Sequence, residues 1–472
     1  MPWQPRALHY CAFICASLAA CSVGSRYRRP DIPLAQQWSA PSPSGESSTP
    51  GSQAGVWPAP GWWHDFGSAR LDTLIAQAQQ DNDDLAAAIA RVQEADAQLR
   101  IAGAPLLPAV DLGATATRER APVTGGQSFH TFNLFNPGVS ASYELDFWGK
   151  NRAARDAARA AAVASRYDRE TVALTVVSSV ASTYFQALEL RDRLQVARQN
   201  LDNGEKILRG LSFEQDVGTA TGLDVAQQAT VVALLYAAIP PLEQQLRQTV
   251  YALAVLIGKT PETVDVDQGS LTELKDPRVV SGLPSSLLTR RPDIAEAEQQ
   301  LVAANADITV ARAELFPTIE LTASGGYEST MLSSLVNPMN RVYALSAGLT
   351  QPIFHGGALR GQLAFSKARY TELATTYHKT VLTALSNVES ALVAVRQTAE
   401  QQQRQAQAVN KAKRAYEFAQ IQMSAGTVNI LTVLNTENAL FSAQDTLVQV
   451  QFSHLQALVD LFTALGGGWQ QG

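Results

Sequence analysis

Four segments of the chain alternate between apolar and polar residues. The clearest, 138–147, has apolar side chains at odd positions, separated by Ser140, Ser142, Glu144 and Asp146. A period of two predicts a strand with one apolar and one polar face. We therefore expect two strand pairs, 109–118 with 138–147 and 318–327 with 342–354. Each strand has about ten residues, as a tilted transmembrane strand needs, although half-buried strands of a soluble sheet share this period.

Four strands are too few to close a barrel, for which about eight is the practical minimum. Open strand edges are not tolerated in lipid. If these strands cross a membrane, several copies of the chain must share one barrel. Two copies would supply eight strands and three would supply twelve, and the pattern itself does not choose between them.

Long helical segments follow each strand pair. No glycine or proline occurs from Lys150 to Asn203 or from Gln362 to Ala425, and the second segment would span roughly 95 Å as a helix. Apolar residues recur at coiled-coil spacings of three and four, as at Leu385, Val388, Leu392 and Val395. A Gly-Thr turn and a returning helix should follow each one. A soluble helical bundle would explain these helices, but it would leave the strand pairs unexplained.

The whole series of elements occurs twice. The prolines that close the helices before the strand pairs, Pro108 and Pro317, are 209 residues apart, and Gly218-Thr219 and Gly426-Thr427 are 208 apart. So long an offset indicates duplication of a large unit. We expect a first repeat at 67–260, a linker at 261–290 and a second repeat at 291–468, in a fold that is mainly α with membrane β.

The N-terminus reads as a secretory signal. Arg6 precedes an apolar stretch, and residues 1–20 are too short and too weakly apolar to span a membrane. Leu18-Ala19-Ala20-Cys21 resembles a bacterial lipobox, which makes Cys21 the expected lipidation site; ordinary cleavage beside a stray cysteine is the alternative. The mature chain would hold one cysteine and no internal disulfide. Residues 21–66 would form a lipidated, extended N-terminal segment.

Charge and motifs exclude several classes of function. The formal net charge is −6, which gives no sign of a nucleic-acid binder. The six histidines show no metal-ligand spacing, and no catalytic constellation or nucleotide-binding loop is present. We therefore expect no enzyme activity, no cofactor and no metal, and the energy for any transport must come from a partner.

Several strings in this order resemble the outer-membrane efflux protein (TolC-like) family, in its NodT/OprM-like lipoprotein branch serving RND-type systems. They are Ala104-Pro105-Leu106-Leu107-Pro108, Tyr143-Glu144-Leu145-Asp146-Phe147-Trp148-Gly149-Lys150, Arg290-Arg291-Pro292-Asp293-Ile294, Ala313-Glu314-Leu315-Phe316-Pro317 and Gln351-Pro352-Ile353-Phe354-His355-Gly356-Gly357. The resemblance implies a homotrimer with a shared twelve-stranded outer-membrane barrel and a long α-helical periplasmic barrel. It would be a passive exit duct for drugs or other small molecules.

The resemblance also implies partners and a location. A periplasmic adaptor (membrane fusion) protein and an inner-membrane pump of RND type would complete a tripartite system. The chain would be lipid-anchored in the outer membrane, in contact with its lipid, and would span the periplasm. The rival hypothesis is a periplasmic structural or adhesive coiled-coil lipoprotein, which would be soluble without its anchor.

By the same resemblance, the helix tips meet the adaptor and hold the gate. The candidate tip residues are Asp216, Gly218, Thr219, Asp224, Gly426, Thr427 and Val428. Some family channels close with inward acidic residues, but Val428 occupies the expected acidic position. An apolar or hydrogen-bonded closure is therefore an equal possibility. The loops 118–136 and 328–341 would face outside the cell.

Strand phase supplies candidate residues for the barrel. Asp111, Glu144, Asp146 and Glu320 would line the lumen, where they either favour cationic solutes or only solvate the inner wall. Phe147 and Trp148 would belong to the aromatic girdle at the membrane interface.

Overall fold

The computed structural model describes residues 23–24, 26–33, 35, 37–39, 57–122, 129–266, 268–279, 282 and 284–470. The expected signal peptide, 1–20, and the expected lipidation site Cys21 lie outside the described residues. The chain divides into two compact units. The sheet unit takes in the described residues of Met1–Asp31, with Arg91–Arg166 and Glu296–His378. The bundle unit holds the rest, so each unit draws on both sequence repeats.

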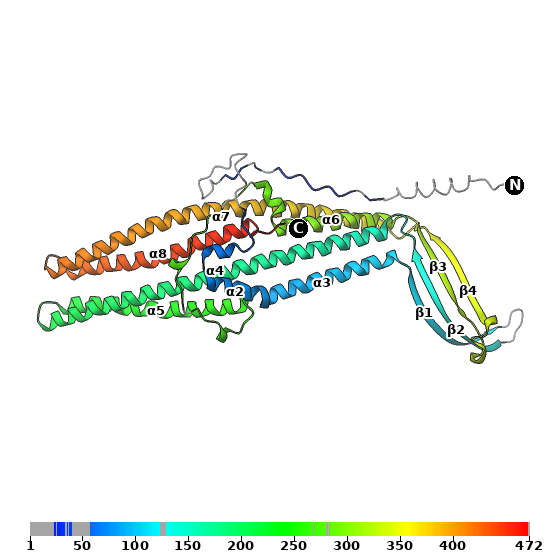
Figure 1. Cartoon of the computed structure of the whole chain (residues 1–472), viewed down its shortest axis with the longest axis horizontal. Coiled ribbons are helices and arrows are strands. Elements are labelled where there is room, and N and C mark those ends of the chain that lie inside the picture. Colours follow the sequence, from blue (N-terminus) through cyan, green and yellow to red (C-terminus); the bar gives the residue numbers. More distant parts are fainter. Residues whose placement is uncertain are drawn as a thin grey trace. The chain divides into compact units, whose positions relative to one another are not determined.

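The sheet unit contains one antiparallel sheet in the order β1-β2-β3-β4 (Figure 1). This confirms the prediction of four strands per chain. The strands are β1 (Ala109–Pro122), β2 (Phe129–Glu144), β3 (Thr318–Tyr327) and β4 (Arg341–Thr350). Apolar and polar residues alternate along each strand, because successive side chains of a strand point to opposite faces of the sheet.

The first hairpin differs from its expected bounds. Much of the expected loop 118–136 is strand, because Arg118 pairs with Asn133 and Ala121 with His130. This extension carries charged residues at apolar positions, which hid it from the alternation pattern. The Arg120 guanidinium lies over the Phe129 ring, 5.3 Å from its centroid.

The other strand ends also depart from the expected bounds. β2 ends at Glu144 instead of residue 147, because the chain turns tightly there and the Phe147 amide donates to the Leu145 carbonyl at 2.8 Å. β4 ends at Thr350 instead of residue 354, shortly before Pro352, which has no amide hydrogen for a strand bond. β3 has the bounds that the pattern predicts.

Seven α-helices are described. They are α2 (Ala69–Asp81), α3 (Asp83–Gly103), α4 (Lys150–Asp216), α5 (Gly222–Leu256), α6 (Pro292–Ala313), α7 (Ala358–Ser424) and α8 (Ile430–Ala464). α4 continues through Gly204 and Gly210, beyond the uninterrupted segment that ended at Asn203. α5 is continuous through Pro240 and Pro241, whose rings face outward.

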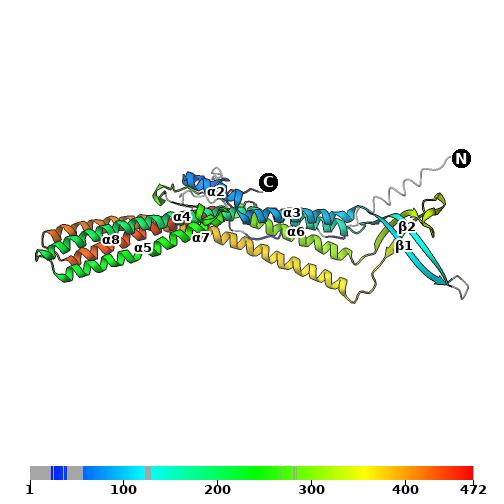
Figure 2. The same ribbon diagram turned by 90° about the horizontal axis from the view of Figure 1, so that it is seen from below.

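In the bundle unit, parts of α4 and α7 lie side by side with α5 and α8 (Figures 1 and 2). One core cluster contains residues of all four helices, with Leu211 from α4, Tyr416 from α7 and Val433 from α8 buried and Leu235 from α5 packed against them. The seam spacing of three and four places these side chains on facing stripes. The expected coiled-coil spacing of apolar residues therefore explains how these helices pack.

The beginning, linker and end of the chain meet in the bundle unit. Trp57 Nε1 donates to the Leu465 carbonyl at 3.0 Å, and the Arg290 guanidinium covers the Trp57 ring at 4.7 Å. A Cβ at Gly466 would lie 2.0 Å from the Arg290 carbonyl oxygen, so only glycine fits there. The C-terminal glycines thus serve close packing as well as ending α8.

Within the described ranges, two helices, α4 and α5, are long and apolar enough to cross a membrane by length and composition alone. Helices buried in the core of a soluble protein can be equally long and apolar. Val180 and Leu188 of α4 are fully buried in the bundle unit, so packing explains much of the apolar character of α4. On α5, by contrast, Leu234 and Val255 are 66% and 69% exposed.

Candidate functional site

Strand register gives the sheet one polar and one apolar face. Directly paired residues in neighbouring strands share a face. Asp111 pairs with Ser140, and Ser140 pairs with Ser324. The row one residue away, Val110–Ala141–Ala323–Leu345, lies on the opposite face, and so does the row Tyr143–Leu321–Ala347. Over these rows the strands place polar residues on one side and apolar residues on the other.

No part of the described chain covers the apolar face. Leu112 is 83% exposed, Tyr343 86% and Leu345 78%. Side chains of this size rarely form a contiguous exposed surface in a soluble monomer. The face must therefore meet lipid or another apolar surface.

The outer strands of the sheet, β1 and β4, each have one unpaired edge among the described residues. Such edges present rows of free backbone N–H and C=O groups. In lipid these groups must find partners, because water is absent. The sheet is therefore incomplete as a membrane structure when it consists of one chain.

Three of the four lumen candidates share the polar face of the sheet. Asp111 lies on β1, and Glu144 pairs directly with Glu320 across β2 and β3. Lys150 Nζ lies 2.6 Å from a Glu144 carboxylate oxygen and offsets part of this paired acidic charge.

Asp146 has a different role from the lumen residue that strand phase predicted. It lies beyond the end of β2, and its carboxylate accepts hydrogen bonds from the Asn151 and Arg152 amides, both at 2.9 Å. These amides belong to the first turn of α4, where backbone donors are otherwise unsatisfied. Arg152 also forms an ion pair with it. Asp146 therefore caps α4.

The aromatic pair also lies outside β2. Trp148 Nε1 donates to the Pro317 carbonyl at 2.7 Å, and the indole stacks on Phe316 at 4.8 Å. Phe147 contacts Trp148 edge to face. These contacts join the end of β2 to the start of β3. The membrane-girdle role of Phe147 and Trp148 remains a prediction.

The helix tips are two matching turns in the bundle unit. Gly218 and Gly426 have φ of 81° and 72°, a left-handed conformation that favours glycine. Thr219 and Thr427 follow, and each donates its backbone amide and its hydroxyl to the carbonyl five residues earlier. The repeated Gly-Thr pair thus ends each long helix in the same way.

The acidic tip candidates are held within the turns. Asp216 is the last residue of α4. Asp224 forms a capping box with Thr221 at the start of α5, and the Thr221 hydroxyl, followed by its amide, lowers the pKa of that carboxyl. Val428 is half-buried beside Asn429, the N-cap of α8.

Sequence reasoning missed two features near the tips. Large apolar side chains are exposed around both turns, among them Phe213, Val217, Leu223, Phe418, Ile421 and Leu431. A glutamate, Glu437, is fully buried in the bundle. The exposed residues occupy the outer positions of apolar helices, which periodicity alone does not separate from core positions.

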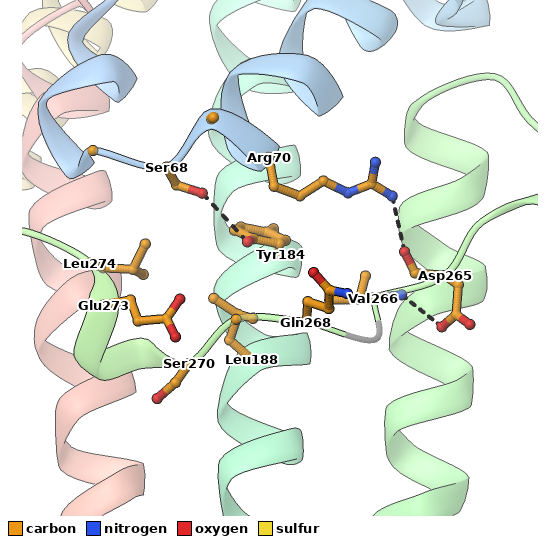
Figure 3. A pocket seen from close by; sticks show the side chains of 13 residues that line it. Ser68, Arg70, Tyr184, Leu188, Asp265, Val266, Gln268, Ser270, Glu273 and Leu274 are labelled. Atoms are coloured by element: carbon orange, nitrogen blue, oxygen red, sulfur yellow. Dashed lines mark hydrogen bonds between the residues drawn. The ribbon is translucent and has the colours of Figure 1, made fainter.

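The bundle unit also has a cavity of about 490 Å³ beside α2 and α4 (Figure 3). Arg70 donates to the Asp265 carbonyl at 3.0 Å on one side, and the hydroxyls of Ser68 and Tyr184 lie 3.4 Å apart on another. Among the described residues, no group of three or more His, Cys, Asp or Glu side chains could hold a metal ion.

Comparisons with known proteins agree with this architecture. The family model described as outer membrane efflux protein matches residues 74–259 and 283–467. The pyoverdine export outer membrane protein OpmQ of Pseudomonas putida is 41% identical over 435 residues, which cover 91% of this chain and 92% of that protein. The cation efflux system protein CusC of Escherichia coli is 31% identical over 469 residues, 99% of each chain.

Solved structures give the same result. The outer-membrane channel OprN superposes with a TM-score of 0.89 at 26% identity, over 96% of this chain and 100% of that chain. The Campylobacter jejuni CmeC outer membrane channel has a TM-score of 0.88 at 25% identity, over 96% of each. The resemblance inferred from the sequence is confirmed, and the chain belongs to the outer membrane efflux protein family.

Proposed function

We propose that this chain is the outer-membrane channel of a tripartite efflux system, a passive duct through which small molecules leave the cell. The observation that carries the proposal is the two-faced sheet with two unpaired edges. Its exposed apolar face suits lipid, and its polar face suits a water-filled lumen. Family membership supports the same function.

Closure of the barrel requires further copies of the chain. Three copies would supply twelve strands if the β1 edge of one chain pairs with the β4 edge of the next. The exposed apolar residues of α5, such as Leu234 and Val255, would then have neighbouring helices to cover them. We therefore infer a homotrimer, anchored in addition by a lipid on Cys21.

The sequence has no nucleotide-binding motif that could power transport, so a partner must supply the energy. We infer that the chain is not an enzyme and needs no cofactor, and that an inner-membrane pump of RND type supplies the energy. A periplasmic adaptor would bind the tips at Gly218-Thr219 and Gly426-Thr427. The exposed Phe213 and Phe418 offer it apolar contacts. Closure at the tips would rest on Val428 and hydrogen bonds instead of an acidic ring.

The relatives favour one class of cargo. OpmQ, named for pyoverdine export, is 41% identical to this chain in one species and 42% in another, against 33% for the toluene efflux protein TtgC. We propose pyoverdine or a similar secreted small molecule as the cargo. Asp111, Glu144 and Glu320 on the polar face would give the lumen at most a weak preference for cations.

Planar-bilayer recording on purified, full-length protein tests the duct. The wild type should insert as a trimer and show a pore, and Asp111→Asn should lower its cation preference by a small factor without changing the single-channel conductance greatly. Protein that stays monomeric, or a trimer that never conducts even after the tips are loosened by Gly218→Ala, would reject the assignment.

A further inference from the structure

A glutamate lies at the centre of the four-helix packing in the bundle unit. Glu437 of α8 is 0% exposed, and neither carboxylate oxygen has a hydrogen-bond partner. It lies on the same helix face as buried residues three and four positions away, Val433, Leu434, Leu440 and Phe441. An ionised carboxylate without partners is very costly in such surroundings. The surroundings of Glu437 therefore disfavour its ionised form.

A second unsatisfied group belongs to α5. Gln228 is also 0% exposed, and its Nε2 donates to the Gly204 carbonyl of α4 at 2.9 Å. That bond fixes the amide, so Oε1 remains an acceptor without a donor. Gln228 is also the neighbour whose side chain lowers the pKa of the Glu437 carboxyl, against the larger effect of burial. Three buried acceptor oxygens, two on Glu437 and one on Gln228, therefore lack a hydrogen-bond partner.

Protonation of Glu437 would give one of these oxygens a hydrogen to donate. A protonated Glu437 has an O–H group, which the free Oε1 of Gln228 can accept. Burial is the main cause that raises the pKa of Glu437, from 4.5 to about 7. The ionisable group that faces it is Tyr416 of α7, whose pKa burial, and secondly Glu437, raise to about 12. α5 contributes the neutral Gln228, and the Gly204 carbonyl of α4 accepts from that amide.

We propose that Glu437 and Gln228 form a proton-linked latch in the bundle of α4, α5, α7 and α8. With the proton in place, the Glu437 hydroxyl donates to Gln228 Oε1 and joins α8 to α5, while Gln228 Nε2 joins α5 to α4. When the proton leaves to solvent, the carboxylate needs water, and α8 separates from α5 to admit it. The latch goes beyond the duct function, because it concerns the stability of this packing whether or not solute passes.

The direction of the pH effect follows from linkage. Below the unfolded-state pKa, about 4.5, the closed and opened forms both carry the proton, so this group adds no pH dependence. Between about 4.5 and about 7 only the closed form keeps it, and the opening equilibrium rises about tenfold per pH unit. Above about pH 7 both forms are ionised and the effect levels off.

Infrared titration of the full-length trimer in detergent tests the proton directly. The wild type should show the carbonyl band of a buried carboxylic acid at about pH 5.5 that is gone at about pH 8.5. Glu437→Gln should lack this band. Glu417→Gln removes an exposed carboxyl from the same bundle and should leave the band unchanged.

Hydrogen exchange tests the mechanical consequence. After correction for the intrinsic pH dependence of amide exchange, opening around 430–441 should rise more than tenfold from about pH 5.5 to about pH 8 in the wild type and in Glu417→Gln. In Glu437→Gln, whose amide keeps the shape of the protonated acid, it should stay flat. A wild type without the titrating band, or a Glu437→Gln variant with unchanged pH-dependent opening, would overturn the latch. Neither result bears on conduction, so the duct is judged separately.

Discussion

At the scale of single residues, Gly218 and Gly426 hold the left-handed backbone of the two tip turns. A Cβ at Gly218 would meet no atom within 4 Å, so space does not explain the glycine. Its backbone conformation does, because residues other than glycine pay to adopt it. The Thr side chains that follow then return hydrogen bonds to the ends of α4 and α7.

Gly218→Ala should therefore destabilise the α4–α5 tip by about 1 kcal/mol, which hydrogen exchange of the tip amides would detect. Gly210→Ala is the matched control. It lies inside α4 with no atom within 4 Å of a new Cβ, and alanine should stabilise the helix there by roughly 0.5–1 kcal/mol. Equal effects of the same sign at both positions would show that the turn conformation is not what selects glycine.

Residue roles were predictable only where they depend on local sequence. The Gly-Thr turns were evident, because their geometry involves neighbours a few positions away. Asp146 was placed in the lumen by strand phase, yet it caps α4, since the strand ends two residues earlier. Glu437 gave no signal, because its burial depends on Tyr416 and Gln228, which come from other helices.

At the scale of elements, the alternation of apolar and polar residues predicted four strands. The strand register explains this success, because residues of the same kind lie side by side across the sheet. Each polar row continues across the sheet, as in Glu144–Glu320–Gly348. The extension of the first hairpin was missed because Arg118 and Arg120 occupy positions of the apolar face. Pairing with β2 keeps those residues in a strand despite their charge.

Adjacent residues of β4 provide a test of the two faces. Leu345 lies on the apolar face and Ser346 on the polar one. Leu345→Arg should cost about 2–4 kcal/mol if that position meets the membrane interior, and the yield of folded trimer from outer membranes should fall sharply. Ser346→Arg should leave the yield near that of the wild type. The opposite order would place the lumen on the other side of the sheet.

At the scale of the whole molecule, the sequence duplication did not produce two separate domains. Each compact unit combines segments of both repeats, such as Arg91–Arg166 with Glu296–His378. Periodicity within a segment cannot reveal this, because it depends on contacts between residues about two hundred positions apart. The family resemblance supplied what local patterns could not.

Sharing of the barrel between copies can be tested by cysteine cross-linking in a Cys21→Ser background. Ala114→Cys on β1, combined in turn with cysteines along β4, should give cross-linked dimers and trimers at one register. The pair Ala141→Cys and Ala323→Cys, whose positions are directly opposite in one chain, should cross-link only within the monomer. This background should also still need detergent for extraction. Aqueous extraction with no linked copies would favour a periplasmic coiled-coil lipoprotein instead.

The meeting of Trp57, Arg290 and Leu465 has a consequence for biogenesis. These residues come from the start, the middle and the end of the chain. A polypeptide emerging from its N-terminus cannot complete this junction until Leu465 has been translocated. Premature termination near residue 460 should leave an export intermediate that proteases remove, even though nearly all of the wall-forming sequence has been made.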